Sequence, residues 1–283
     1  MKPVPSPVPT AVTDNPWYTL RQFTAARIAL GRSGVSLPTQ PQLAFQLAHA
    51  RARDAVHLAL DVPQLLHDLE SAGLSQTAKT LVLESAAADR LQYLQRPDLG
   101  RRLSDASRGR LNALPAQAMA RGFDLAVVLA DGLSALAVAQ QAVPLLRALQ
   151  PYIAAAQWSL APLAIVRQGR VAVGDEIGQL LGARALLLLI GERPGLSSPD
   201  SLGAYLTWMP RVGLTDASRN CISNIRPAGL SCDEAAFKAH YLLAEMQRRQ
   251  LSGVLLKDET RLNASLPSAP VAADVNFLLE GGP

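Results

Sequence analysis

Glu192 is the residue of this sequence whose surroundings most favour chemistry with a ligand. It follows residues 185–190, a run of six apolar side chains without alternation. Such a run is typical of a parallel strand that is buried on both faces. In open α/β sheets, ligands bind in the crevice beyond the carboxyl ends of these strands. Pro194 stiffens the loop that carries Glu192, so we expect a carboxylate held firmly beside a ligand crevice.

Cys221 is the second candidate, because it lies in a segment where small polar residues interleave with apolar ones, residues 219–225. A catalytic thiol needs a nearby base to form the thiolate, and the sequence around Cys221 offers none. A free cysteine can also pack as a small hydrophobic side chain. A third possibility is that the segment lines a ligand pocket without doing chemistry. The sequence leaves these three interpretations open.

Two further motifs each allow a ligand-binding and a structural interpretation. Residues 128–134 are predicted to form the end of a strand, a turn at Asp131-Gly132 and the start of a helix. In dinucleotide-binding folds, the first phosphate-binding turn lies at such a junction. The chain has no G-x-G-x-x-G pattern, so we favour a tight turn with Ser134 capping the helix. Residues 96–103 are dense in arginine. They fit either a docking surface for an acidic partner or large ligand, or a solvated helix end with Asp98 near its N-terminus.

Composition and the remaining reactive residues exclude several classes of protein. The net charge is +4, from 27 basic and 23 acidic residues, and the two signs are interspersed along the chain. Nucleic-acid-binding proteins usually cluster their basic residues, so this distribution argues against nucleic-acid binding. The four histidines and two cysteines form no metal-binding pattern, so we expect no metal site. The run at residues 185–190 is far too short to cross a membrane. With only two cysteines and no signal peptide evident, we expect a cytoplasmic protein.

The elements that must position these residues fall into four regions. Residues 1–16 are rich in proline and predict a flexible tail. Residues 17–122 read as a mostly helical region, including one helix over residues 77–94 that Ser75 can cap. From Phe123 onward, apolar strand-like runs alternate with helical segments, which indicates βαβ units. We therefore predict an α/β protein with a Rossmann-like domain and a mostly parallel sheet at residues 123–260, followed by a C-terminal tail at 261–283.

The predicted strands and helices of this domain can be located individually. Strands are expected at residues 125–129, 162–166 and 185–190, with further short ones at 205–208 and 254–256. Helices are expected at 133–143, 171–182 and 233–250, the last with Ser231 or Asp233 as its N-cap. Val171 would follow the second strand, Glu192 the third, and Cys221 the possible fourth. All three could meet at one edge of the sheet.

Five short blocks of this sequence together resemble the light chain, or small subunit, of ethanolamine ammonia-lyase. The blocks are Tyr93-Leu94-x-Arg96-Pro97-Asp98-x-Gly100-Arg101-Arg102-Leu103, Asp131-Gly132-Leu133-Ser134, Gln168-Gly169-Arg170-Val171, Gly191-Glu192-Arg193-Pro194-Gly195-Leu196 and Asn220-Cys221-Ile222-Ser223-Asn224-Ile225. They recur in the family's order over residues 17–253. Each block alone is weak evidence, whereas the set of five is specific.

The resemblance implies an enzyme that depends on adenosylcobalamin and consists of a large barrel subunit and this small subunit. Such a pair converts ethanolamine to acetaldehyde and ammonia by a radical route, with the substrate held in the large subunit. The small subunit helps to hold the corrinoid at the subunit interface. The family's cofactor-contacting positions correspond to Val171, Glu192 and Cys221, and none of its catalytic residues falls on this chain.

Two departures qualify what the resemblance implies. The chain lacks the D-x-H-x-x-G motif with which some proteins give a histidine to cobalt, so the cofactor is expected to keep its own base as lower ligand. Residues 1–16 differ from the amphipathic segment that targets many family members to a bacterial microcompartment, which puts such enclosure in doubt. The alternatives are a nucleotide-dependent oxidoreductase on a Rossmann-like fold and a non-catalytic binding subunit.

Overall fold

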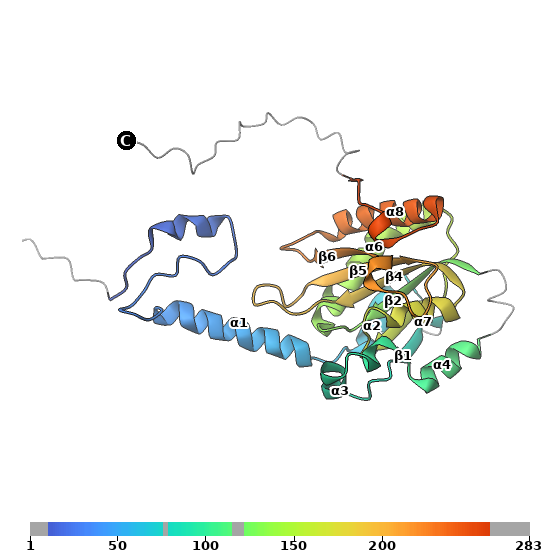
Figure 1. The fold of residues 1–283 in the computed structure, drawn as a ribbon, viewed down its shortest axis with the longest axis horizontal. Coiled ribbons are helices and arrows are strands. Elements are labelled where there is room, and N and C mark those ends of the chain that lie inside the picture. Colours follow the sequence, from blue (N-terminus) through green and yellow to red (C-terminus); the bar gives the residue numbers. More distant parts are fainter. Residues whose placement is uncertain (1–10, 76–78, 115–121, 261–283) are drawn as a thin grey trace, which may run out of the picture.

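The chain forms one mixed β-sheet between two layers of helices, with an N-terminal arm that extends away from this body (Figure 1). The computed structural model describes residues 11–75, 79–114 and 122–260. Residues 1–10, most of the predicted proline-rich tail, and the predicted C-terminal tail at 261–283 lie outside this description. The sheet contains six strands: β1 (Leu81–Glu84), β2 (Phe123–Ala130), β3 (Ala164–Arg167), β4 (Ala183–Gly191), β5 (Leu202–Trp208) and β6 (Arg219–Ile225).

The strand order is β1-β3-β2-β4-β5-β6, and the sheet changes direction at β4. The first four strands in this order are parallel, whereas β5 is antiparallel to both β4 and β6. The prediction of a mostly parallel sheet is therefore wrong, and the sheet does not support the Rossmann-like description. The reason is the connection between β4 and β5, which contains no helix and so cannot carry the chain back for a parallel crossover.

The strand β1 lies where the sequence predicted a helix over residues 77–94. Leu81–Glu84 pairs in parallel with β3, and the one α-helix in the described part of the predicted span is the short α3 (Arg90–Gln95), at its end. A run of four residues is too short for its periodicity to separate strand from helix, so pairing with β3 decided its conformation. The expected last strand at 254–256 is likewise absent, because a 3-10 helix, η5 (Gly253–Leu255), occupies that place.

Helices cover the two faces of the sheet unequally. One face packs against α2 (Val62–Ser71), α6 (Ala135–Ala155) and α8 (Cys232–Arg249), and α6 and α8 reach as far as β5. The other face packs against α4 (Asp105–Asn112) and α7 (Val173–Leu180), and α7 lies mainly over β2 and β4 and reaches β6 at its first residue, Arg219. Beyond that residue, neither β5 nor β6 has a main helix contact on this face within the described residues, and Cys221 is exposed there. The fold thus leaves part of one sheet face open.

The helices begin where polar side chains satisfy their first backbone N–H groups. Ser134 accepts a hydrogen bond from the backbone of Ala137 at the start of α6, as predicted. Ser231 forms a reciprocal capping box with Glu234 at the start of α8, which confirms Ser231 as the N-cap. Alternate residues of β2 enter the two cores: Leu125, Val127 and Leu129 on the α6 side, and Ala126, Val128 and Ala130 on the α7 side.

The turn after β2 approaches the end of β4 so closely that only glycine fits there. A Cβ atom on Gly191 would lie 2.0 Å from the carbonyl oxygen of Ser134 and 2.7 Å from that of Asp131. Gly132 has a φ of +59° and faces the same backbone. The backbone N–H of Leu133 donates to Gly191 O at 2.9 Å, which fixes where the chain leaves β4 toward Glu192.

We predict that Gly191→Ala destabilises the protein by about 3 kcal/mol or more, because the added methyl group collides with backbone that cannot move independently. The midpoint of urea unfolding would measure this loss. Gly109→Ala is the matched control: Gly109 lies in α4 with no atom within 4 Å of its added Cβ. That change should raise stability by about 0.5–1 kcal/mol. Equal effects of the two substitutions would contradict the close approach.

Candidate functional site

Glu192 lies directly after β4 and is held at three points. Its backbone N–H donates to Ser201 O at 2.9 Å. Its carboxylate accepts from Ser201 Oγ at 2.5 Å and from the backbone N–H of Asn224 at 3.2 Å, both on the same oxygen, Oε2. The side chain is half-buried, and within the described residues no group donates a hydrogen bond to its other oxygen, Oε1. The carboxylate is therefore fixed through Oε2, while Oε1 lies beside Gly203 of β5.

Cys221 lies on β6 directly opposite Tyr205 of β5. Partial burial of the sulfur raises the pKa of the Cys221 thiol above its ordinary value. The nearby Tyr205 hydroxyl opposes this effect, and the negative charge of Glu192 reinforces it. The thiol therefore stays protonated at neutral pH. This state does not suit a nucleophile, and it leaves Cys221 as an exposed residue of the face that also carries Glu192.

Val171 lies in the loop between β3 and α7, at the edge of the sheet where the parallel strands end. It is half-buried and packs against the core on the α7 side of the sheet, as Tyr205 does. The structure thus brings Glu192 and Cys221 together around Tyr205 and places Val171 on the same side of the sheet. No direct contact between Val171 and the other two is recorded among the described residues.

Two features of this site could not be singled out in the sequence. Tyr205 was expected only as the start of a short strand, yet it lies opposite Cys221 in the sheet and, like Glu192, beside Gly203. Asp175 at the start of α7 forms a buried ion pair with Arg219 at the start of β6. The ion pair connects the helix that follows Val171 with the strand that carries Cys221. Partners that lie 44 residues apart leave no local signal in the sequence.

Asp131, in the turn after β2, binds the backbone of the loop after β3. Its carboxylate accepts from the backbone N–H groups of Gln168 at 2.9 Å and Gly169 at 3.1 Å, and the residue is 4% exposed. Burial raises the pKa of Asp131, although these hydrogen bonds and the charge of Arg90 oppose that rise. The backbone donors of the loop after β3 are thus already occupied. Together with the Ser134 cap, this confirms the structural interpretation of the Asp131-Gly132 turn.

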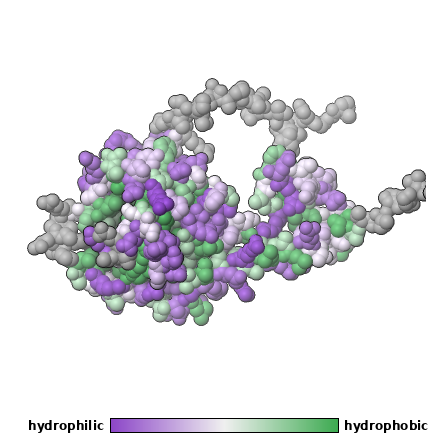
Figure 2. Space-filling model, turned by 180° about the vertical axis from the view of Figure 1, so that it is seen from behind, coloured by the Kyte–Doolittle hydropathy of each residue, from purple (hydrophilic) through white to green (hydrophobic). Residues whose placement is uncertain are grey.

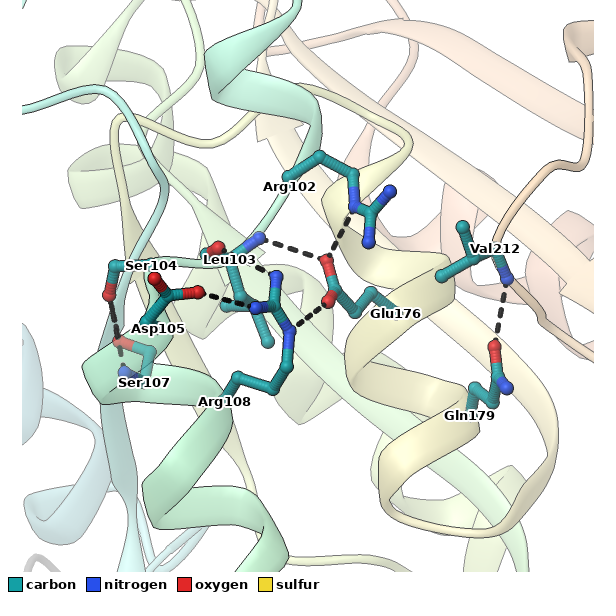
Figure 3. A network of polar contacts seen from close by, with 9 residues as sticks. All are labelled: Arg102, Leu103, Ser104, Asp105, Ser107, Arg108, Glu176, Gln179 and Val212. Carbon is teal, nitrogen blue, oxygen red and sulfur yellow. Dashed lines mark hydrogen bonds and ion pairs between the residues drawn. The ribbon is translucent and has the colours of Figure 1, made fainter.

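The arginine-rich block at residues 96–103 divides into a solvated and a structural part. Arg96 and Asp98 form an exposed ion pair at 2.7 Å. At the other end, Glu176 of α7 accepts from Arg102 Nε at 3.1 Å, from Leu103 N at 3.0 Å and from Arg108 Nε at 2.7 Å, as Figure 3 shows. Gly100 O also accepts from Arg170 N at 2.7 Å. This end of the block braces α7 and the loop that carries Val171.

Other kinds of site find no support in the described part of the chain. No group of three or more histidine, cysteine, aspartate or glutamate side chains is arranged to hold a metal ion there. Within the same residues, no helix is both long and apolar enough to span a membrane.

The fold and the site define an α/β protein with an open sheet face, on which a fixed carboxylate, a phenol and a protonated thiol are available to a ligand. The family model described as ethanolamine ammonia-lyase light chain matches residues 14–257. The chain therefore belongs to the ethanolamine ammonia-lyase light chain family.

Curated relatives agree with this assignment over nearly the whole chain. The ethanolamine ammonia-lyase small subunit of Ralstonia nicotianae is 58% identical over 96% of this chain and 97% of its own length. The subunit of the same name from Pseudomonas aeruginosa strain UCBPP-PA14 is 59% identical over 96% of this chain and 97% of its own length. That of Pseudomonas putida strain GB-1 is 57% identical, covering 96% and 98%.

We predict that Glu176→Gln destabilises the protein, because two guanidinium groups and the N–H of Leu103 lose a charged acceptor that is almost fully buried. Hydrogen bonds to a charged group contribute about 1.5–3 kcal/mol, and the loss should fall in this range. Chemical denaturation at pH 7 would measure it. Asp98→Asn serves as the control, since the ion pair of Asp98 with Arg96 is exposed and should contribute little.

The pH dependence of stability tests the same network. Burial disfavours the charged form of Glu176, but the hydrogen bonds from Leu103, Arg108 and Arg102 outweigh it and lower its pKa below the ordinary 4.5. Because the pKa of Glu176 is lower in the folded state than in the unfolded state, Glu176 contributes stability above pH 4.5. This contribution is lost as the pH falls through the folded-state pKa of Glu176. Wild-type stability should therefore fall more steeply below pH 4.5 than that of Glu176→Gln. If the stability of the wild type and of Glu176→Gln falls with the same slope below pH 4.5, Glu176 does not have the lowered pKa.

Proposed function

We propose that this chain is the small subunit of an adenosylcobalamin-dependent ethanolamine ammonia-lyase, which converts ethanolamine to acetaldehyde and ammonia by a radical mechanism. In this proposal the chain holds the corrinoid at its interface with a large barrel subunit, and the large subunit holds the substrate. Membership of the light chain family supports the reaction class. The observation that carries the role of this chain is the open face of β5 and β6 beside Glu192.

The residues on this face suit the chemistry of a corrinoid, which is a broad apolar ring fringed by amide groups. A carboxylate such as Glu192 can accept hydrogen bonds from amide N–H groups. Cys221 and Val171 can provide apolar contact to the ring. Glu192 lies over the buried backbone of Gly203, where an added Cβ would be 3.0 Å from Oε1.

The division of labour follows from what each component can do. Adenosylcobalamin supplies the radical chemistry when it is bound. The residues of this chain would bind and orient the cofactor: Glu192 fixed by Ser201 and Asn224, and Cys221 fixed by its place on β6. None of the four histidines lies on β5 or β6, since they are on α1 (Thr39–His57), α2 and α8. The absence of an imidazole on this face supports a cofactor that keeps its own base as lower ligand.

The arm supports the need for a partner subunit. It consists of η1 (Pro16–Gln22), the loop after it and α1 (Figure 1). The nineteen residues of α1 bury only Ala55, while Leu43 and Leu47 are more than half exposed. Figure 2 shows hydrophobic residues on the surface of the arm. A helix with so little burial gains little stability from its own chain, which is consistent with assembly on another subunit.

The two alternatives differ from this proposal in testable ways. The nucleotide-dependent oxidoreductase lacks support, because the chain has no G-x-G-x-x-G pattern. A non-catalytic binding subunit would assemble with the large subunit without affecting the binding of cobalamin. The free cysteines Cys221 and Cys232 are consistent with the reducing cytoplasm that we propose as the location.

Reconstitution tests the proposed function directly. We expect the purified chain alone to produce no acetaldehyde from ethanolamine and adenosylcobalamin, because in this proposal the large subunit holds the substrate. Activity should appear when the large subunit is added, and it should rise to saturation with the amount of this chain. Turnover by this chain alone, or full activity of the large subunit without it, would overturn the proposal.

We predict that Glu192→Gln weakens the affinity of the complex for adenosylcobalamin and that Glu192→Ala weakens it by about ten- to a hundredfold, since the hydrogen bonds of a charged acceptor are lost. Turnover at saturating cofactor should fall much less. Titration of the assembled complex, followed by its absorbance spectrum, measures the affinity. Glu245→Gln on α8, which covers the other sheet face, is the matched control.

A purely structural role of Glu192 predicts a different result. The carboxylate also holds Ser201 and Asn224, so its loss could loosen the loop after β4. The thermal unfolding midpoint and the assembly of the subunits should therefore be measured with the same variants. Lost assembly together with unchanged cofactor affinity in the remaining complex would mean that Glu192 is structural.

A further inference from the structure

Arg226 lies directly after β6 and joins the end of that strand to the loop that carries Glu192. Its Nε donates to Asn224 Oδ1 at 2.8 Å, and its Nη1 donates to Ser197 O at 2.9 Å. The carboxylate of Asp200 lies 3.8 Å from the same Nη1, and the Arg226 side chain is only 14% exposed. The guanidinium is therefore held between two segments of the chain instead of extending into solvent.

The backbone of Asn224 presents its N–H group to the carboxylate of Glu192. Asn224 has a φ of +60°, in the left-handed region that asparagine tolerates better than most residues. Its N–H donates to Glu192 Oε2 at 3.2 Å, and its carbonyl oxygen accepts from Leu230 N at 2.8 Å. A Cβ on Gly229 would lie 2.3 Å from that carbonyl oxygen, so the turn over residues 224–230 is tightly closed. The donor to Glu192 thus comes from a well-fixed turn.

The contacts of Arg226 and Glu192 form a closed circuit between the two segments. Asn224 donates to Glu192 and accepts from Arg226, and Arg226 also donates to Ser197, in the same loop as Glu192. Arginine suits this place because its planar guanidinium presents several N–H donors in fixed directions. Within the described residues, no hydrogen bond or ion pair joins Arg226 directly to Glu192. Arg226 therefore acts on the carboxylate through Asn224 and through the loop.

We propose that Arg226 is a positioning residue for the contact of Glu192 with the cofactor. By holding Asn224 and Ser197, it fixes the Glu192 carboxylate through Oε2 and leaves Oε1 as the acceptor for amide groups of the corrinoid. The inference rests on the proposed function and extends it to a residue outside the five motifs that identified the family. The buried arginine is thus part of the cofactor site without being a ligand of the cofactor.

Arg226→Ala tests this role in the complex reconstituted with the large subunit. We expect the dissociation constant for adenosylcobalamin, measured by absorbance titration, to rise about three- to tenfold. In a Glu192→Ala background, the same substitution should change the dissociation constant by less than about twofold, because no carboxylate remains to be oriented. A merely structural role of Arg226 would weaken binding by the same factor in both backgrounds.

Hydrogen exchange of the complex without cofactor gives a readout that does not depend on cobalamin. Loss of Arg226 should speed the exchange of residues 222–226 about three- to tenfold, because the N–H of Asn224 would be free of Glu192 more often. Mass spectrometry of the peptides that cover this segment measures the change. Unchanged exchange would show that Arg226 does not hold the donor to Glu192.

Asn224→Gly is a second variant that removes less of the structure. Glycine adopts a φ of +60° freely and keeps the N–H that Glu192 binds, whereas the Oδ1 acceptor of Arg226 is lost. Cofactor affinity should fall in the same direction as for Arg226→Ala and should depend on Glu192 in the same way. If Arg226→Ala fails to fold or to assemble, as its unfolding midpoint would show, Asn224→Gly decides the question.

Arg248→Ala is the matched control. Arg248 lies on α8, which covers the other sheet face, and its ion pair with Glu245 is exposed. The substitution should change neither the affinity for adenosylcobalamin nor the exchange of residues 222–226.

The possible outcomes distinguish this inference from the proposed function. Unchanged affinity of a folded Arg226→Ala complex, or an equal loss of affinity with and without Glu192, overturns the inference. Unchanged affinity of Glu192→Ala overturns the Glu192 contact and the inference with it, although the complex would still bind the cofactor. Failure of the wild-type complex to bind adenosylcobalamin would contradict the proposed function itself.

Discussion

The carboxylate of Asp131 is the contact on which the arrangement of this sheet edge depends. It follows β2 and accepts from the two backbone N–H groups that follow β3, at Gln168 and Gly169. One residue further along, the turn contacts the end of β4 through Leu133 N and Gly191 O. A single buried turn thereby fixes the ends of three parallel strands relative to each other. The loops that carry Val171 and Glu192 both leave from these fixed ends, so the turn determines where each of them begins.

The reversal of direction after β4 creates the open face. Because β5 returns as an antiparallel neighbour, no crossover helix covers β5 and β6 on the α7 side, whereas α8 covers them on the other. The strand alternation then places Ile222 in the core and Cys221 on the open side. A mostly parallel sheet would have required another helix over this face. The departure from a parallel sheet is therefore what leaves a surface for a large ligand.

Two adjacent acidic residues at the start of α7 hold this helix from both sides. Asp175 pairs with Arg219 on β6, and Glu176 accepts from Arg102, Arg108 and the backbone of Leu103 (Figure 3). Their position in the first turn is also favourable for the helix dipole. Since Val171 lies just before this helix and Cys221 just after Arg219, the same clamp connects two of the proposed cofactor contacts without touching the ligand surface.

Features that depend on neighbouring residues or on family membership could be predicted from the sequence. The strand at 185–190, the Ser134 and Ser231 caps and the loop position of Glu192 all follow from local patterns, and the five motifs identified the family. Three further features depend on the whole fold: the strand at residues 81–84, the antiparallel direction of β5, and the pairing of Tyr205 with Cys221. The difference lies in the sequence distance over which each interaction acts. Helix capping and apolar periodicity involve residues a few positions apart. Strand pairing and buried ion pairs join residues far apart in the sequence, so no local pattern identifies the partner.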